Sequence, residues 1–201
     1  MLPILAALFV SGLGACTGAA PSFDPAGPCV VHDRPVDGRA AGAYPELEAL
    51  VPATFDGRGP NRLDSGRNCS ERNLGTMVAR GIREVRFAGG LWEVGQRSGV
   101  SLAVFRGEGL SAPILFEFYE TGARTAPKTD AIETTDVSVG GISGRRVDTL
   151  NDESYQTVVV WGGGDGAVRV ALVGSDVRET QARAVHESRV TAALAAFPAA
   201  R

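Results

Sequence analysis

Lysine, histidine and cysteine are scarce in this chain of 201 residues. It contains one lysine, Lys128, two histidines and three cysteines, and its formal net charge is −3. A domain that binds nucleic acid carries clustered cations that meet the phosphates, and no such excess is present. Two histidines, with no Cys-x-x-Cys pair, supply too few ligands for a zinc site. We therefore expect no nucleic-acid partner, no metal and no cofactor.

Charged side chains are also missing from the first fifteen residues, Met1 to Ala15, although the chain as a whole is 21% charged. This run is shorter than the roughly 20 apolar residues that span a bilayer comfortably, and it has the length of a signal-peptide core. Residues 1–15 are therefore predicted to be a signal peptide that is removed on maturation. With 44% hydrophobic residues overall, the remainder is typical of a globular protein rather than a disordered one.

The end of the apolar run, Leu13-Gly14-Ala15-Cys16, resembles the lipobox of bacterial lipoproteins. The resemblance implies cleavage before Cys16 and attachment of a diacylglycerol to its sulfur. Two acyl chains anchor stably, because each buried methylene contributes about 0.8 kcal/mol. The chain departs from the family pattern in having no Lys or Arg before the apolar core. An ordinary cleaved secretion signal is the alternative.

This resemblance sets the expected location of the protein and its first expected partner, which is the membrane, bound through the N-terminal lipid. We expect the protein at a bacterial membrane, lipid-anchored and facing the extracytoplasmic side. Once Cys16 is lipidated, Cys29 and Cys69 remain, and an even pair in an exported chain is predicted to form a disulfide. Two free thiols or a metal-binding pair are the alternatives.

The mature chain divides into two parts. Residues 16–43 are rich in proline and glycine without sustained periodicity, which predicts a flexible tether. Residues 44–201 have the size and patterning of a single α+β domain.

Four helices are predicted in this domain from apolar spacing, capping residues and helix-ending Gly or Pro. Strand is a rival for the third, because Ile114, Phe116 and Phe118 alternate. In the last and longest, Asp176 and Glu179 resemble a capping box. The helices cover residues 45–51, 70–80, 112–121 (ending at Gly122) and 177–197.

Between these helices the apolar period changes to two, which indicates strands. Gly89-Gly90 suggests a tight turn, and short glycine-rich loops favour antiparallel pairing. The fold class is therefore α+β: an antiparallel sheet of six or seven strands, one face covered by helices, with a long C-terminal helix. The predicted strands are residues 82–87, 91–94, 100–104, 131–139, 145–150, 155–161 and 167–173.

Catalytic motifs are sparse. The glycine run at 162–166 leads into a strand rather than a helix, which favours a turn over a phosphate-binding loop. No Gly-x-Ser-x-Gly occurs. His186 lies in the apolar arc of the last helix and is interpreted as a hydrogen-bonded core histidine. His32, next to Asp33, is interpreted as solvated surface.

Other candidate groups have ordinary structural interpretations. Asp148, Asp152 and Glu153 crowd one turn and could ligate Ca²⁺, but they lack the DxDxDG spacing and are interpreted as a solvated hairpin tip. Trp92 and Trp161 could line an apolar pocket, although aromatic residues on strands belong more often to the core. The arginines are dispersed, with Arg145-Arg146 the one adjacent pair.

The order of elements after residue 80 is similar to that of PsbP-like domains of bacterial lipoproteins. Val137-Ser138-Val139-Gly140-Gly141, followed by hairpin strands and a final helix, carries this likeness over residues 80–197. The resemblance implies a binding or assembly-support domain without a shared catalytic set, so no functional residue carries over.

These observations together favour a lipid-anchored extracytoplasmic domain that binds a partner protein or a small apolar ligand without catalysis. One alternative is an extracytoplasmic enzyme whose Asp, Glu or Arg residues are brought together by the fold. Another is a structural accessory subunit of an envelope complex. The sequence contains no recognisable catalytic set, which favours binding over catalysis.

Overall fold

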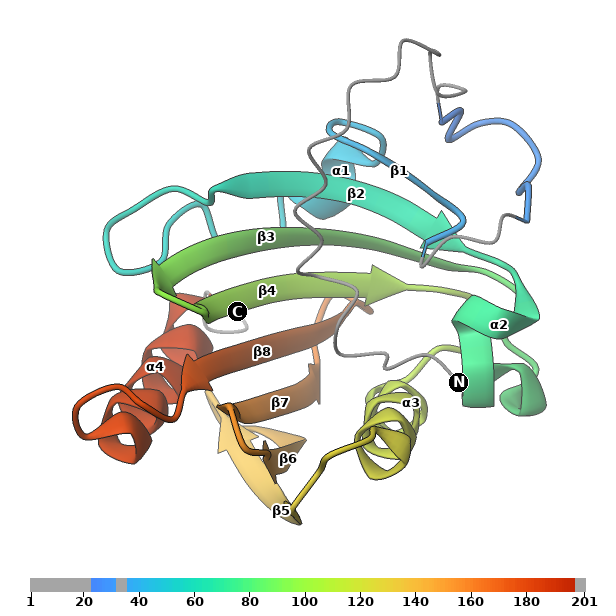
Figure 1. The fold of residues 1–201 in the computed structure, drawn as a ribbon. Coiled ribbons are helices and arrows are strands. Elements are labelled where there is room, and N and C mark those ends of the chain that lie inside the picture. The colour runs from blue at the N-terminus through green and yellow to red at the C-terminus, as the bar shows by residue number, and fades with distance from the viewer. Residues whose placement is uncertain (1–22, 32–35, 198–201) are drawn as a thin grey trace, which may run out of the picture.

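The computed structural model describes residues 23–31 and 36–197. The predicted signal peptide, Cys16 and His32 lie outside these ranges. A single antiparallel sheet of eight strands organises the described part, in the order β1-β2-β3-β4-β8-β7-β6-β5 (Figure 1). Its strands are β1 Gly38–Ala40, β2 Arg62–Asn68, β3 Val85–Gly95, β4 Ser98–Arg106, β5 Ala131–Val139, β6 Ile142–Leu150, β7 Ser154–Gly162 and β8 Val168–Asp176.

The sheet consists of two four-stranded meanders. Strands β1–β4 form one, strands β5–β8 form the other, and helix α3 (Ala112–Thr125) connects them. The last strand of each meander pairs with the other, β4 with β8, and this pair joins the two halves. Every neighbouring pair is antiparallel, as the short glycine loops predicted, and the α+β class is confirmed with one or two strands more than expected.

Helices cover both faces of the sheet, whereas the sequence interpretation had one face covered. Helices α1 (Pro45–Glu48) and α4 (Ala182–Ala196) pack on one face. Helix α2 (Glu71–Leu74), the 3-10 segment η2 (Gly75–Arg80) and α3 pack on the other. Figure 1 shows α3 and α4 on opposite sides of the β5–β7 half. The reason lies in strands such as β7, where Val158 and Val160 contact the α3 side while Val159 and Trp161 contact the α4 side.

Strand β3 runs without interruption through the two glycines that suggested a turn. Gly89 and Gly90 pair with Ala103 and Leu102 of β4, so both are strand residues. A β-carbon at Gly90 would lie 2.6 Å from the indole Cη2 of Trp92, which explains why glycine is needed there. The strands 82–87 and 91–94 are therefore one element.

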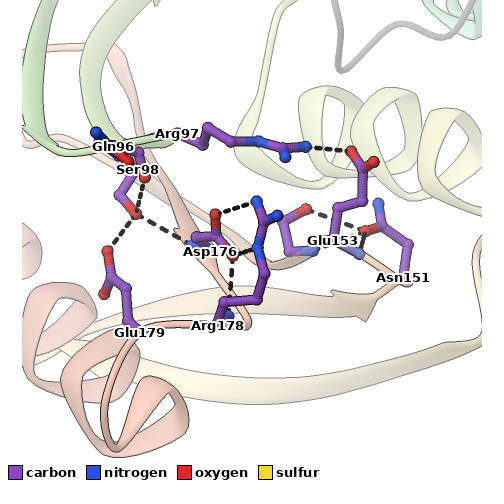
Figure 2. Close-up of polar contacts among 9 residues, drawn as sticks. Gln96, Arg97, Ser98, Asn151, Glu153, Asp176, Arg178 and Glu179 are labelled. Carbon is purple, nitrogen blue, oxygen red and sulfur yellow. Dashed lines mark hydrogen bonds and ion pairs between the residues drawn. The ribbon is translucent and has the colours of Figure 1, made fainter.

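Both long helices differ from their predicted bounds. Helix α3 continues past Gly122, which is buried against the sheet rather than ending the helix, and the strand alternative for this segment is wrong. Helix α4 begins at Ala182 instead of residue 177, so Asp176 and Glu179 are not its capping box. Asp176 is the last residue of β8 and Glu179 lies in the β8–α4 loop; Asp176 accepts from Arg178 and Glu179 accepts from Ser98 (Figure 2).

Part of the segment predicted as a tether is built into the domain. Strand β1 lies within residues 16–43 and pairs with β2, and neither strand was predicted, because their polar residues lack alternation. The buried Arg67 donates from Nη2 to the carbonyl oxygens of Asp24, Gly27 and Pro28 at 3.2, 2.7 and 2.9 Å. One arginine thereby holds the described residues 24–28 against β2.

Candidate functional site

The predicted disulfide is present. Cys29 and Cys69 are bonded, with their Cα atoms 6.4 Å apart, and the Asp37 carboxylate lies beside the sulfur atoms. That carboxylate accepts hydrogen bonds from the backbone N–H of Cys69 and Ser70 at 2.7 and 2.8 Å and from Asn73 Nδ2 at 2.9 Å. Burial alone would raise the pKa of Asp37, but these hydrogen bonds outweigh it and hold the pKa below its ordinary value. Because its atoms are already engaged, this group is a structural anchor rather than a metal site.

A pocket of about 110 Å³ lies between α4 and the β5–β7 half of the sheet. Helix α4 packs mainly on β8, with fewer contacts to β4 and β7, so among the described residues it leaves the β5–β6 side of this face less covered. The pocket contains apolar, acidic and basic groups. Its lining residues are Ala131, Glu133, Asp148, Thr149, Leu150, Tyr155, Gln156, Arg183, His186 and Glu187.

The inner wall of the pocket is a buried chain of hydrogen bonds centred on His186. Its Nε2 lies 2.8 Å from Thr157 Oγ1 and its Nδ1 lies 3.0 Å from Ser175 Oγ. The Thr157 hydroxyl donates to Asp148, and therefore accepts from Nε2–H. Ser175 Oγ accepts from Arg189 Nη1 at 3.0 Å, so its own hydrogen is available for Nδ1. A neutral His186 imidazole protonated at Nε2 therefore gives every donor and acceptor in this row of hydrogen bonds a partner.

Arg146 extends this row of hydrogen bonds to the surface of the pocket. Its Nε donates to Asp148 at 2.6 Å and its Nη2 donates to Glu187 at 2.7 Å, which ties strand β6 to helix α4. Burial would lower the pKa of Arg146, but the two carboxylates outweigh it and raise that pKa. The same contact lowers the pKa of Glu187. The Arg146 guanidinium and the Glu187 carboxylate are therefore both ionised at neutral pH.

The other end of this hydrogen-bond chain reaches a polar cluster at one end of the sheet, where β4 begins and β8 ends (Figure 2). Arg189 bridges Ser175 and Glu179, and Glu179 accepts from the Ser98 hydroxyl at 2.5 Å. Ser98 in turn accepts from the backbone N–H of Asp176 at 3.0 Å. Arg97 pairs with Glu153 nearby, so three loops are linked at this end of the sheet.

The described carboxyl groups with shifted pKa values all shift downward. In Asp176 the side-chain hydrogen bond from Arg178 is the main cause. In Glu179 burial would raise the pKa, but hydrogen bonds from Ser98 and Arg189 outweigh it. Asp37, Glu120, Asp165 and Glu187 shift the same way. A general acid needs a raised pKa instead.

The remaining sequence candidates are not brought together. Asp148 points to Arg146 and Thr157, whereas Glu153 pairs with Arg97 and Asp152 is exposed, so the three do not form a calcium site. The side chains of the adjacent Arg145 and Arg146 lie on opposite faces, and the Arg145 guanidinium stacks 4.4 Å from the Phe116 ring centre.

Both tryptophans belong to the core, as the sequence predicted. Trp92 is buried and donates from Nε1 to the Arg58 carbonyl at 2.8 Å. Trp161 packs edge-on against Phe197. Neither lines the pocket.

His186 is buried and hydrogen-bonded, as its place in the apolar arc predicted. Its partners were not predicted, although polar residues inside buried strands gave a signal. Thr157 and Ser175 are both completely buried within β7 and β8, a position that polar side chains take only with a partner. Periodicity places each on a face but does not identify the residue opposite it.

We expect a pH dependence of stability from His186. Burial lowers its pKa below 6.5; the nearby Glu187 and Asp148 carboxylates act to raise that pKa, whereas Arg146 and Arg189 lower it further. Between 6.5 and the folded pKa only the unfolded chain binds the proton, so the free energy of unfolding should fall as pH falls through this window. Each unit of separation corresponds to about 1.4 kcal/mol.

Urea unfolding of the domain between pH 7.5 and 5.5 measures this effect. His186→Gln should flatten the profile, while His32→Gln should leave it unchanged. An equal slope in the His186→Gln variant would assign the pH dependence to other groups.

No protein-family model matches the sequence, and no curated protein matches it. What the pocket can bind is therefore inferred from the residues that line it.

Proposed function

We propose that this protein is a lipid-anchored extracytoplasmic domain that binds a small ligand or a partner protein at the pocket between α4 and β5–β7, without catalysis. The observation that carries the proposal is the inner wall of this pocket. A continuous chain from Arg146 through His186 to Arg189 holds its polar groups in place before any ligand arrives. Preordered polar groups beside apolar surface reduce the entropic cost of binding.

The lining favours a ligand with an apolar body and a hydrogen-bonding or cationic group. Leu150 and Tyr155 provide apolar surface, and the Tyr155 ring lies 5.8 Å from the His186 ring. Glu133, Asp148 and Glu187 provide carboxylates on the same side. Asp148 and Glu187 are already paired with Arg146, so a purely apolar ligand would leave Glu133 as the carboxylate without a partner among the described residues.

Binding is favoured over catalysis by the state of the groups that resemble catalytic ones. Ser175 and Thr157 contact His186, as a nucleophile contacts its base, but both hydroxyls are completely buried beneath the pocket and cannot reach a substrate. The carboxylates around them are paired with arginine. The lowered pKa values leave these groups unsuited to general acid catalysis.

The disulfide supports the extracytoplasmic side of the proposal, since such bonds persist in oxidising compartments. The anchor itself rests on the lipobox resemblance at Cys16. None of the helices in the described ranges is long and apolar enough to cross a bilayer.

Mass spectrometry of the mature N-terminus tests the anchor. From a bacterial host, the mature chain should begin at Cys16 with a diacylglycerol on its sulfur, and Cys16→Ser should abolish both cleavage and the lipid. An unmodified Cys16, or a start elsewhere, would contradict the anchor.

Binding at the pocket is tested by NMR with a library of small amines and aromatic alcohols. We expect shifts confined to residues around Tyr155 and His186, and their loss in Tyr155→Ala. Leu63→Ala, an exposed change on β2, is the matched control and should bind normally. Shifts scattered over the surface, or none, would argue against a ligand pocket. Co-purification with a membrane complex would then support the accessory-subunit alternative.

A further inference from the structure

The two edges of the sheet differ. Strand β1 has only three residues, and the Phe23 ring lies against its Gly38. Strand β5 has nine residues, Ala131–Val139, in unbroken register with β6. In the described part of the chain nothing pairs with its outer edge. A long, regular edge of this kind presents unpaired backbone groups to any strand that approaches.

The turn after β5 determines which groups point outward. Gly140 and Gly141 have φ of 57° and 83°, the geometry of a two-residue type I′ turn, which closes on the hydrogen-bonded pair Val139–Ile142. Hydrogen-bonded pairs then alternate along the hairpin, so the odd-numbered residues of β5 bond to β6. The N–H and C=O groups free to bond outward belong to Ile132, Thr134, Asp136 and Ser138.

The charges of β5 are all acidic. Glu133 lies directly opposite Asp148 on β6, and like charges in that position cost stability. Asp148 is paired with Arg146, but Glu133 has no ion-pair or hydrogen-bond partner among the residues described. Asp136 is 93% exposed and has Arg145 at 3.5 Å. The edge therefore lacks a cation beside Glu133.

We propose that the outer edge of β5 binds an extended strand of a partner protein that places a lysine or arginine opposite Glu133. This inference rests on the proposed binding function and names the class of partner. The position opposite Glu133 is a non-hydrogen-bonded one, in which Cα atoms approach to about 4.5 Å and side chains are closest. Because Glu133 also lines the pocket, the basic side chain would lie at its rim.

A second copy of this chain is the less suitable occupant. Antiparallel pairing of two β5 strands would bring two copies of Glu133 and of Asp136 into one ladder, and the strand itself contributes no cation. A strand with a basic residue supplies the missing charge and uses the same backbone groups, as in other cases of strand addition.

Two nine-residue peptides of threonine and valine, acetylated and amidated, with lysine or glutamate at the centre, are suitable probes. Amide hydrogen exchange should show the lysine peptide protecting residues 132, 134, 136 and 138, with no change at 133, 135 and 137. This alternation is specific to strand addition. Glu133→Lys should reverse the preference, so that the glutamate peptide binds several-fold more tightly than the lysine peptide.

Thr134→Pro removes one outward N–H but no hydrogen bond to β6, and should weaken the lysine peptide about tenfold. Thr134→Val keeps that N–H and equally loses the hydroxyl contact with Glu120, so it should bind like the parent. Unaltered binding in Thr134→Pro, protection without alternation, or no binding of either peptide would overturn the proposal. Protection that grows with protein concentration alone would assign the edge to a second copy.

The binding of small amines at the pocket is independent of peptide binding at the β5 edge. Small amines should still bind Thr134→Pro, because its side chain lies on the α3 face, away from the pocket. Loss of peptide binding with retained amine binding would overturn only this inference. Loss of amine binding in the parent protein would instead count against the proposed function.

Discussion

Replacing Cys29 and Cys69 together with serine should lower the free energy of unfolding by roughly 4 kcal/mol. The bridge joins residues 40 positions apart, and closing a loop of this length removes about that much unfolded-state entropy in the chain-entropy treatment. Urea unfolding with intrinsic tryptophan fluorescence measures the change.

The loss should concentrate around Arg67. Without the bridge, residues 24–28 are held by its three hydrogen bonds and the Phe23 contact, so their amides should exchange faster than those of β7. Reduction of the parent protein should reproduce the effect of the double variant. Equal stability of the oxidised parent and the double variant would show that the bridge does not constrain this segment.

Arg146→Ala should destabilise the domain by about 3 kcal/mol, because removing the shared cation of this half-buried cluster leaves its partners uncompensated. Two carboxylates, Asp148 and Glu187, would lose their shared cation at once. The estimate lies at the low end of the range for buried pairs because the three side chains are 18%, 30% and 44% exposed. Ligand binding at the pocket should be lost too.

Arg145→Ala is the matched control. It is the neighbouring arginine on the opposite face, pairs with the exposed Asp136 and stacks on Phe116, so about 1 kcal/mol is expected. A double variant, Arg146→Met with Asp148→Asn, should recover part of the stability, because one uncompensated charge is removed. If Arg146→Ala and Arg145→Ala cost the same, the Arg146 pairs contribute no more than surface contacts.

Local patterns in the sequence predict the elements well where neighbours along the chain decide the conformation. The β5–β6 and β7–β8 hairpins were predicted because glycine turns join two apolar runs, and both lie where expected. The predicted helix 70–80 does begin at Ser70, whose side chain caps α2 by accepting from the Asn73 N–H. Predictions failed where a tertiary contact overrode the local signal, as at Gly90, which makes room for Trp92, and at Gly122, which is a buried residue within α3 rather than its end.

The site was predicted only in part, for a similar reason. The apolar arc of the last helix correctly buries His186, and the count of cysteines correctly pairs Cys29 with Cys69. The pocket depends on residues from β5, β6, β7 and α4, more than fifty positions apart at the extremes of the sequence. Their meeting depends on strand order and register, which pattern alone leaves open.

What the sequence determined by itself is the part governed by neighbours and by composition: an α+β class, its hairpins, the pairing of Cys29 with Cys69, and a lysine-poor chain with a net charge of −3. Only the tertiary structure decided that both faces are covered, that Arg146 joins β6 to α4, and that Glu133 lies on an edge strand without a cation among the described residues. The physical reason is that burial and charge pairing depend on distance in space, while periodicity reports only which face of an element each residue occupies.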